Sequence, residues 1–232
     1  MWFGTEEGIS IYDGVRTTVY KPSEYHRGDT NPTGNWTRSI AGDKDGNVFF
    51  ESDYALIRYD IRTQKFSRLR ESAVHSVASI NGTIWVGIAD SVFTWNSDKN
   101  KLDFVTKLES RYQHATCFRE DSKGRYWIGT TDGLFRMNED KSLTCQIVGE
   151  DIYSLFEDSK RNLWISIRMN GLYKRDAHGN FTRYRYDPSN PNNISSNQVR
   201  DFAEDNFGNI WIGTFTGLNK YNPTSNRFEV YT

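Results

Sequence analysis

Apolar and aromatic residues alternate with polar ones in short runs along this chain, and clusters of turn residues separate the runs. The last 34 residues show the pattern most clearly. Four strands of four to six residues are predicted there, at Val199–Glu204, Ile210–Thr214, Leu218–Tyr221 and Phe228–Tyr231. The turn at Asp205–Asn209 contains Gly208, which can take a positive φ. Short alternating runs joined by short turns predict a four-stranded antiparallel sheet of consecutive hairpins.

The second strand of this unit recurs along the whole chain as Trp-Ile-Gly-Thr or a variant of it. Its copies begin at Trp2, Phe49, Trp85, Trp127, Trp164 and Trp211. The intervals are 47, 36, 42, 37 and 47 residues, with a mean of about 42, which is the repeat length of a propeller blade. The pattern therefore predicts an all-β fold, a β-propeller in which each copy contributes one blade.

The blade count suggests part of a larger ring. One propeller domain is expected over residues 1–232, with blades at about 1–20, 38–70, 74–106, 114–148, 151–186 and 198–232. There are six second strands but only five first strands, because the chain opens directly on Trp2. We expect about six blades, five four-stranded and one three-stranded, as a fragment of a seven-bladed or tandem propeller. Open strand edges need cover, so further propeller blades or a second copy of the chain are the expected partners.

The recurring tryptophan is predicted to pack between adjacent blades. It is a large apolar side chain at one register of a strand rich in Ile and Val, which is a core environment. The alternative is a row of tryptophans that stack on sugar rings, but strict recurrence inside an apolar strand argues against it.

The segment Asp-x-x-Gly-Asn-Ile-Trp-Ile-Gly-Thr-x-x-Gly-Leu-x-x-Tyr resembles the two-component regulator propeller repeat. The match is specific at 127–134 and 208–221 and is degraded at 49–60, where Phe-Phe-Glu-Ser replaces Trp-Ile-Gly-Thr, and at 85–95. The Pro/Asn-rich loop at 190–197 is also typical of that family. Such repeats form the periplasmic sensor region of hybrid two-component systems in gut Bacteroidetes.

That resemblance implies seven-bladed rings, usually two in tandem, that bind oligosaccharides from complex glycans. It also implies a membrane-anchored parent protein in which an immunoglobulin-like domain, a membrane helix, a histidine kinase, a receiver and a DNA-binding regulator follow the propellers. The expected location is periplasmic, as the extracytoplasmic part of an inner-membrane protein.

Composition narrows the choice of partners. The 29 basic and 30 acidic residues give a net charge of −1 without a block of one sign, so no nucleic-acid partner is expected. No run of about 18 apolar residues is present, so this segment is expected to make no membrane contact. The two cysteines, Cys117 and Cys145, are placed on the first and fourth strands of one blade, roughly 14 Å apart. A disulfide needs Cα atoms within about 7 Å, so both are predicted to be thiols.

The candidate ligand site lies in the loops, where the copies differ. Connections from fourth to first strands and from second to third strands surround one mouth of a propeller. Aromatic rings there can face sugar C–H groups, and planar amide or guanidinium groups can pair with hydroxyls. The predicted ligand-binding residues are Tyr25, Trp36, Tyr54, Arg111, Tyr112, Arg168, Asn170 and Phe215. The alternative is that these are ordinary solvated loops.

No cofactor, metal or catalytic residue is predicted. Asp43-x-Asp45-Gly46-Asn47 resembles the start of a calcium loop, but position twelve, where a bidentate Glu belongs, is Tyr54. The four histidines share no ligand spacing. His114 could act as an acid or base at the channel, but no partner for it is visible in the sequence.

The sequence thus predicts a non-enzymatic, ligand-sensing propeller of a hybrid two-component system that recognises a glycan-derived oligosaccharide and signals across the membrane. Two alternatives stay open. A propeller lyase or hydrolase would need a His and carboxylates that converge on the channel. A structural scaffold would bind nothing at its mouth.

Overall fold

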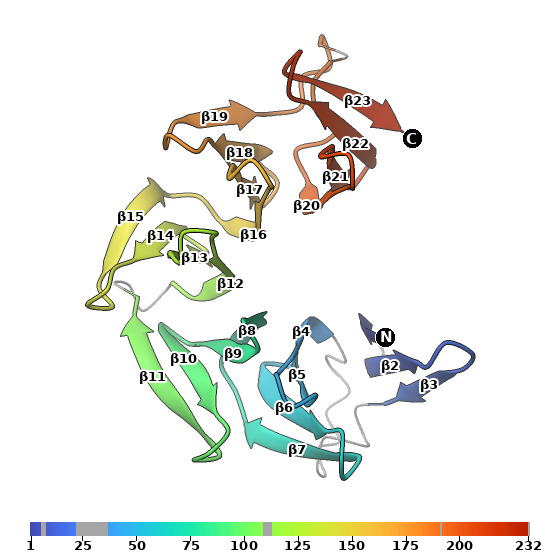
Figure 1. The fold of residues 1–232 in the computed structure, drawn as a ribbon, viewed down its shortest axis with the longest axis vertical. Coiled ribbons are helices and arrows are strands. Elements are labelled where there is room, and N and C mark those ends of the chain that lie inside the picture. The colour runs from blue at the N-terminus through green and yellow to red at the C-terminus, as the bar shows by residue number, and fades with distance from the viewer. Residues whose placement is uncertain (6–7, 22–36, 109–112, 191, 232) are drawn as a thin grey trace. The chain divides into compact units, whose positions relative to one another are not determined.

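A computed structural model describes residues 1–5, 8–21, 37–108, 113–190 and 192–231. All regular elements in these ranges are β-strands (Figure 1), so none is a helix that could cross a membrane. The chain divides into two compact units, Met1–Ala115 and Thr116–Thr232, called unit 1 and unit 2 below.

Unit 1 contains three antiparallel sheets. The first is three-stranded and consists of β1 (Trp2–Thr5), β2 (Gly8–Tyr12) and β3 (Thr17–Tyr20). The second consists of β4 (Thr37–Gly42), β5 (Val48–Ser52), β6 (Ala55–Asp60) and β7 (Lys65–Arg70). The third consists of β8 (Val74–Ile80), β9 (Thr83–Ile88), β10 (Ser91–Asn96) and β11 (Lys101–Lys107).

Unit 2 contains three four-stranded antiparallel sheets, the first of which begins at the last residue of unit 1. That sheet consists of β12 (Ala115–Glu120), β13 (Tyr126–Thr130), β14 (Gly133–Met137) and β15 (Leu143–Val148). The next consists of β16 (Ile152–Glu157), β17 (Leu163–Ile167), β18 (Leu172–Arg175) and β19 (Phe181–Tyr184). The last consists of β20 (Val199–Glu204), β21 (Ile210–Thr214), β22 (Gly217–Asn222) and β23 (Arg227–Tyr231).

Consecutive sheets within a unit pack as propeller blades do. Each four-stranded sheet keeps its strands in chain order, so its first and fourth strands lie at opposite edges. First strands of consecutive sheets contact one another, β4 with β8 in unit 1 and β16 with β20 in unit 2 (Figure 1). The predicted all-β propeller fragment, with five four-stranded sheets and one three-stranded sheet, is confirmed for the described residues.

The aromatic residue near the start of a second strand packs against the next blade of the same unit, as Trp127 and Trp164 show. Trp127 is 1% exposed and shares a core cluster with Ile152 and Ile165 of the next sheet. Trp164 lies among Phe202 and Tyr221 of the sheet that follows it. The predicted packing of these tryptophans between blades is therefore confirmed, and their burial provides much of the contact between blades.

The third position of Trp-Ile-Gly-Thr is a point of close approach between blades. A Cβ at Gly129 would lie 2.5 Å from Cys117 Sγ and 2.7 Å from Ile152 Cγ2. A Cβ at Gly87 would lie 2.6 Å from Ser76 Oγ and 2.9 Å from the carbonyl oxygen of Ala115. Glycine at this position lets the first strand of the following blade come close. A larger residue there fits only where the surrounding side chains leave room for it.

An aspartate organises the turn before the second strand in four of the copies, at Asp43, Asp121, Asp158 and Asp205. In the fifth copy, Asp158 Oδ1 accepts hydrogen bonds from the backbone N–H groups of Lys160 and Asn162, as in an Asx turn. Its Oδ2 accepts the indole N–H of Trp164 at 2.8 Å. The same indole-to-aspartate bond joins Trp127 to Asp121 and Trp211 to Asp205. The aspartate thus bonds both the backbone of the turn and the buried tryptophan, and links the two.

Cys117 and Cys145 lie on β12 and β15, the first and fourth strands of one sheet, and no disulfide joins them. Burial raises the pKa of the Cys117 thiol to about 12, so this thiol stays protonated at neutral pH. The predicted placement of both cysteines, on the first and fourth strands of one sheet, is confirmed.

Candidate functional site

Four first strands contain a β-bulge one residue after their start. The ladder with the second strand shifts register there, which leaves one extra residue outside the regular pairing. The extra residues are Arg38 in β4, His75 in β8, Tyr153 in β16 and Arg200 in β20. Bulges re-aim a side chain and are common beside binding and active sites. The strands around these positions are equivalent, but the side chains differ: two are arginines, one is a histidine and one is a tyrosine.

In unit 1, two of the bulge residues meet at Tyr54, in the turn between β5 and β6. The Arg38 guanidinium lies over the Tyr54 ring at 5.1 Å, and its Nη2 donates a long hydrogen bond of 3.5 Å to the Tyr54 hydroxyl. The His75 ring meets the same tyrosine edge-on at 5.6 Å. Tyr54 therefore joins the two bulges from a turn in which its own φ is +61°.

His75 also stacks on His114, with ring centroids 3.9 Å apart and planes 22° from parallel. Burial and, after it, the charges of His114 and Arg38 lower the pKa of His75 to about 4. His75 is consequently neutral at pH 7. A neutral imidazole carries one donor and one acceptor nitrogen, so His75 can exchange a proton or bind a polar group.

Glu51 in β5 is the buried acid of this region. It occupies the register that holds glycine in most copies of the repeat, and it is 1% exposed. Its Oε1 accepts the backbone N–H of Tyr54 at 2.8 Å, whereas Oε2 is buried without a hydrogen-bond partner among the described residues. Burial raises the pKa of Glu51. Arg38, Glu51, Tyr54, His75 and His114 are called the unit 1 site below.

In unit 2, two guanidinium groups share one bulged tyrosine. Arg168, in the turn between β17 and β18, lies over the Tyr153 ring at 5.1 Å, and Arg200 lies over the same ring at 5.6 Å. Asp151 holds Arg168 in place, because Arg168 Nε donates to Asp151 Oδ2 at 2.6 Å and the Arg168 backbone N–H donates to the Asp151 carbonyl at 2.8 Å. The two arginines are therefore positioned by neighbouring blades around one ring.

A cavity of about 120 Å³ opens beside these side chains. Its lining consists of Tyr153, Arg168, Met169, Gln198, Val199 and Arg200. Val199 gives it a buried apolar wall, and Gln198 contributes an amide side chain to the lining. Asp151, Tyr153, Arg168, Gln198 and Arg200 are called the unit 2 site below.

Two further predicted residues lie next to the unit 2 site. Asn170 donates from Nδ2 to Glu150 Oε2 at 2.7 Å, and its Oδ1 accepts a hydrogen bond from Arg185. Its amide is thus engaged at both ends and braces the turn. Phe215 is 69% exposed, and its backbone N–H donates to the Gln198 carbonyl at 3.0 Å. This bond ties an exposed aromatic ring to the rim of the cavity.

The structure thus groups the described members of the predicted set by unit. Arg168, Asn170 and Phe215 lie together in unit 2, and Tyr54 lies in unit 1. The other four predicted residues, Tyr25, Trp36, Arg111 and Tyr112, lie outside the described residues.

The sequence reasoning missed the bulge residues and Glu51. Arg38, His75, Tyr153 and Arg200 follow the ordinary alternation of a strand, so no local pattern marks them as bulged. Each of them is the second residue of its first strand. An alignment of the repeats would have shown that this position varies among Arg, His and Tyr in these four strands. Glu51 had a plainer signal, a charged residue where other copies have glycine.

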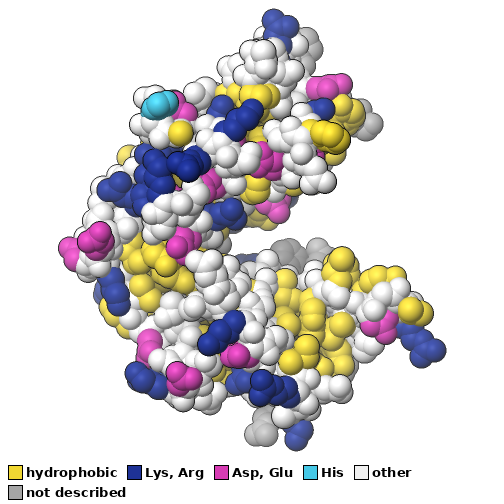
Figure 2. Space-filling model, viewed as in Figure 1, with side chains coloured by type: hydrophobic (Ala, Val, Ile, Leu, Met, Phe, Trp, Pro, Cys, Tyr) yellow, Lys and Arg dark blue, Asp and Glu magenta, His cyan; other side chains and the backbone are white. Residues whose placement is uncertain are grey.

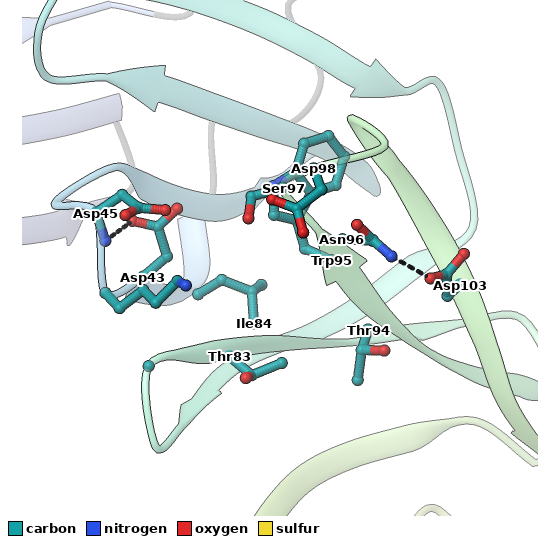
Figure 3. Close-up of a pocket in the computed structure, with 12 residues that line it drawn as sticks. Asp43, Asp45, Thr83, Ile84, Thr94, Trp95, Asn96, Ser97, Asp98 and Asp103 are labelled. Atoms are coloured by element: carbon teal, nitrogen blue, oxygen red, sulfur yellow. Dashed lines mark hydrogen bonds between the residues drawn. The ribbon is translucent and has the colours of Figure 1, made fainter.

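Unit 1 also contains an acidic cavity of about 270 Å³, shown in Figure 3. Asp43, Asp45, Asp98 and Asp103 surround it, together with Trp95. Asp43 accepts two backbone N–H bonds and the Asn47 amide, and Asp103 accepts the Asn96 amide at 2.6 Å. In the described part of the chain no three His, Cys, Asp or Glu side chains are placed to hold a metal ion. Asp43 thus organises the turn before β5, Asp103 links β11 to β10, and no ligand is assigned to the cavity.

On the face of unit 2 shown in Figure 2, Lys and Arg side chains gather over β14, β15 and β18. Arg125 and Arg175 lie over the Trp127 ring at 5.6 and 5.2 Å. Burial and the charges of Arg125 and Arg136 lower the pKa of Arg175. Arg125 and Arg175 therefore belong to the packing around Trp127. Neither residue is a member of the unit 2 site.

Comparison with protein families supports the resemblance drawn from the repeat. Residues 111–132 and 193–216 match the family model described as two component regulator propeller. No curated protein matches this chain. The predicted likeness to the two-component regulator propeller repeat is confirmed.

Solved structures share the fold at low sequence identity. The extracellular domain of a putative hybrid two-component system from B. thetaiotaomicron has a TM-score of 0.69 and 18% identity, covering 100% of this chain and 36% of that chain. PorZ, a surface component of the type-IX secretion system of Porphyromonas gingivalis, has a TM-score of 0.71 and 16% identity over 94% of this chain and 36% of its own. Virginiamycin B lyase from Staphylococcus aureus has a TM-score of 0.66 and 15% identity over 88% of this chain and 71% of its own. The chain spans about a third of the length of the first two proteins, and at these identities the likeness concerns the fold.

Proposed function

We propose that this chain is a ligand-sensing propeller segment from the extracytoplasmic, periplasmic part of a hybrid two-component system. The family-model match and the fold shared with extracellular domains of such systems support this assignment. In the parent protein, further propeller blades would cover the open strand edges, and a membrane helix and a histidine kinase would follow.

The ligand proposed for the segment is a glycan-derived oligosaccharide bound at the unit 2 site. The single observation that carries this proposal is the pair of guanidinium groups held around the Tyr153 ring at the mouth of a cavity. Guanidinium and amide groups pair with sugar hydroxyls, and the exposed Phe215 ring offers a face for sugar C–H groups. All these residues come from strand starts and turns that differ among the repeats.

Signalling would follow from binding that favours one of two arrangements of the protein. A ligand shifts such an equilibrium only by its difference in affinity for the two states. The unit 2 site draws on β16, β20 and the turn after β17. A ligand that contacts all three would therefore bind most tightly when these two blades hold one spacing.

The test is calorimetric titration of the whole chain with a panel of neutral and acidic oligosaccharides, repeated with Arg168→Gln. The matched control is Arg161→Gln, an exposed arginine in the turn before β17. The proposal expects binding that Arg168→Gln weakens and Arg161→Gln leaves unchanged. Equal affinity in all three proteins, or no saccharide binding at all, would contradict it.

A second candidate function is acid–base catalysis at the unit 1 site. The specific observation in its favour is a neutral, stacked His75 close to His114, in the same unit as a buried Glu51 with a raised pKa. A lyase or hydrolase needs a general base and a general acid. The lowered pKa of His75 keeps its imidazole in the basic form at pH 7, and the raised pKa of Glu51 brings that carboxyl closer to neutral pH. Turnover of a glycan or peptide that is lost in His114→Ala and kept in His178→Ala would favour the enzyme over the sensor.

A further inference from the structure

We propose that the unit 2 site recognises an anionic group on its saccharide, a uronic acid carboxylate or a sulfate ester, held between Arg168 and Arg200. This inference rests on the proposed function and specifies the ligand that the sensor reads.

The first observation is positive charge without a full set of partners. Arg200 is exposed and makes no ion pair with a carboxylate of the described residues. Arg168 makes its ion pair with Asp151 through Nε only, so its two terminal nitrogens bond to no described residue. Guanidinium groups bind planar carboxylates and sulfate or phosphate oxygens through paired N–H donors.

The second observation is that both donors are already in place. Arg168 is fixed by its 2.6 Å bond to Asp151, and the β-bulge sets the direction of Arg200. Both guanidinium groups lie within 5.1 and 5.6 Å of the Tyr153 centroid. Because Arg168 and Arg200 both line the same cavity, an anion inside it can accept hydrogen bonds from both guanidinium groups, and their placement before binding lowers the entropy cost.

The third observation is that no acid is among the described residues that line the cavity. Of the neighbouring acids, Asp151 pairs with Arg168 through Oδ2, and Glu150 pairs with Arg183 at 2.8 Å while it accepts the Asn170 amide. Asp151 Oδ1 is buried and has no hydrogen-bond partner among the described residues, so the Asp151 charge offsets part of the positive charge of Arg168.

The size of the cavity limits what enters it. About 120 Å³ accommodates a charged substituent and the edge of one sugar ring, not a whole oligosaccharide. The Gln198 amide can bond a hydroxyl next to the charge. Phe215, tied to Gln198 through its backbone, can contact the following sugar outside the cavity.

The experiment is calorimetric titration of the whole chain with three saccharide probes. Hyaluronan oligosaccharides carry uronic acid without sulfate, carrageenan oligosaccharides carry sulfate without uronic acid, and malto-oligosaccharides are neutral. We expect one acidic probe to bind, with an affinity that falls as salt rises. The probe that binds identifies which anion the site takes.

Arg200→Gln is the decisive variant, because Arg200 is exposed and its replacement leaves the core intact. It should weaken the acidic probe by at least about tenfold, the effect of losing one hydrogen bond to a charged group. Arg161→Gln should leave the affinity unchanged, and thermal unfolding confirms that both variants fold.

The outcomes separate the two proposals. Binding of the neutral probe as tightly as the acidic ones, without loss in Arg200→Gln, would overturn the anionic specificity and keep the saccharide sensor. Binding of no probe would contradict the saccharide sensor and this inference with it.

Discussion

The unit 1 and unit 2 sites use equivalent positions of the repeat but differ in the side chains that occupy them. Each places a residue from the turn between second and third strands against bulge residues, Tyr54 against Arg38 and His75 in one and Arg168 against Tyr153 and Arg200 in the other. Unit 1 adds a buried carboxylate and a neutral histidine. Unit 2 presents two guanidinium groups at a cavity. A uniform sheet framework can thus hold different side-chain chemistry when a few residues of its bulges, turns and second strands change.

The largest expected effect is a loss of stability when a buried aromatic residue is truncated, and it should be the same in both units. Trp127→Ala in unit 2 and Phe49→Ala in unit 1 remove equivalent residues that are 1% and 0% exposed. Each should lower the free energy of unfolding by about 3–5 kcal/mol, the usual cost of truncating a buried aromatic. Chemical denaturation measures both.

Phe207→Ala is the control, because this phenylalanine is 90% exposed and its loss should change stability by less than about 0.5 kcal/mol. A small effect at either buried position would show that the two units do not share one kind of core.

A smaller effect is expected at the third position of the Trp-Ile-Gly-Thr motif. This position holds Glu51 in one copy in unit 1 and Gly129 in one copy in unit 2. Gly129→Ala would place a Cβ 2.5 Å from Cys117 Sγ of the same sheet and 2.7 Å from Ile152 Cγ2 of the next sheet, and such overpacking costs about 1–3 kcal/mol. The matched control is Gly213→Ala at the same motif position, where the nearest atom would be 3.8 Å away. Equal stability of the two variants by thermal unfolding would contradict the close approach of blades at Gly129.

The smallest effect concerns pH and is specific to unit 1. Burial lowers the pKa of His75 from 6.5 to about 4, so the unfolded chain binds the proton more readily than the folded one. The contribution of His75 to stability is therefore complete above about pH 6.5 and is lost as the pH falls toward about 4. His75 is half-buried, so solvent screening reduces the size of this effect.

The measurement is the free energy of unfolding across that pH range in the parent chain and in His75→Gln. The parent should lose stability more steeply on acidification than the variant. His178→Gln, at an exposed position, should follow the parent. Parallel curves for the parent and His75→Gln would show that burial in the folded chain does not lower the pKa of His75.

The framework was predictable from the sequence because its signals are local and repeated. The alternation in Ile210–Thr214, the aspartate turn before Trp211 and the glycine after it each act within a few residues. The packing of Trp164 against the next blade followed from the burial of a recurring large side chain. The thiol state of Cys117 and Cys145 followed from counting strands between them.

The site was less predictable because its contacts join residues far apart in the chain. Arg168 was identified as a loop residue, but its anchor Asp151 and its neighbour Arg200 come from other blade segments. Asn170 looked like a ligand-binding amide, and the structure shows it braced by Glu150 and Arg185. Bulges at Tyr153 and Arg200 depend on how two strands pair, which no single segment reveals.

The central claim is that the saccharide binds at the guanidinium pair of unit 2. The most direct test compares Arg200→Gln with Arg38→Gln, the same bulge position and the same substitution in the two units. Calorimetric titration with the acidic oligosaccharide that binds the parent chain is expected to show at least about a tenfold loss in Arg200→Gln and unchanged affinity in Arg38→Gln. Loss of binding in Arg38→Gln with full affinity in Arg200→Gln would place recognition in unit 1 and contradict the account.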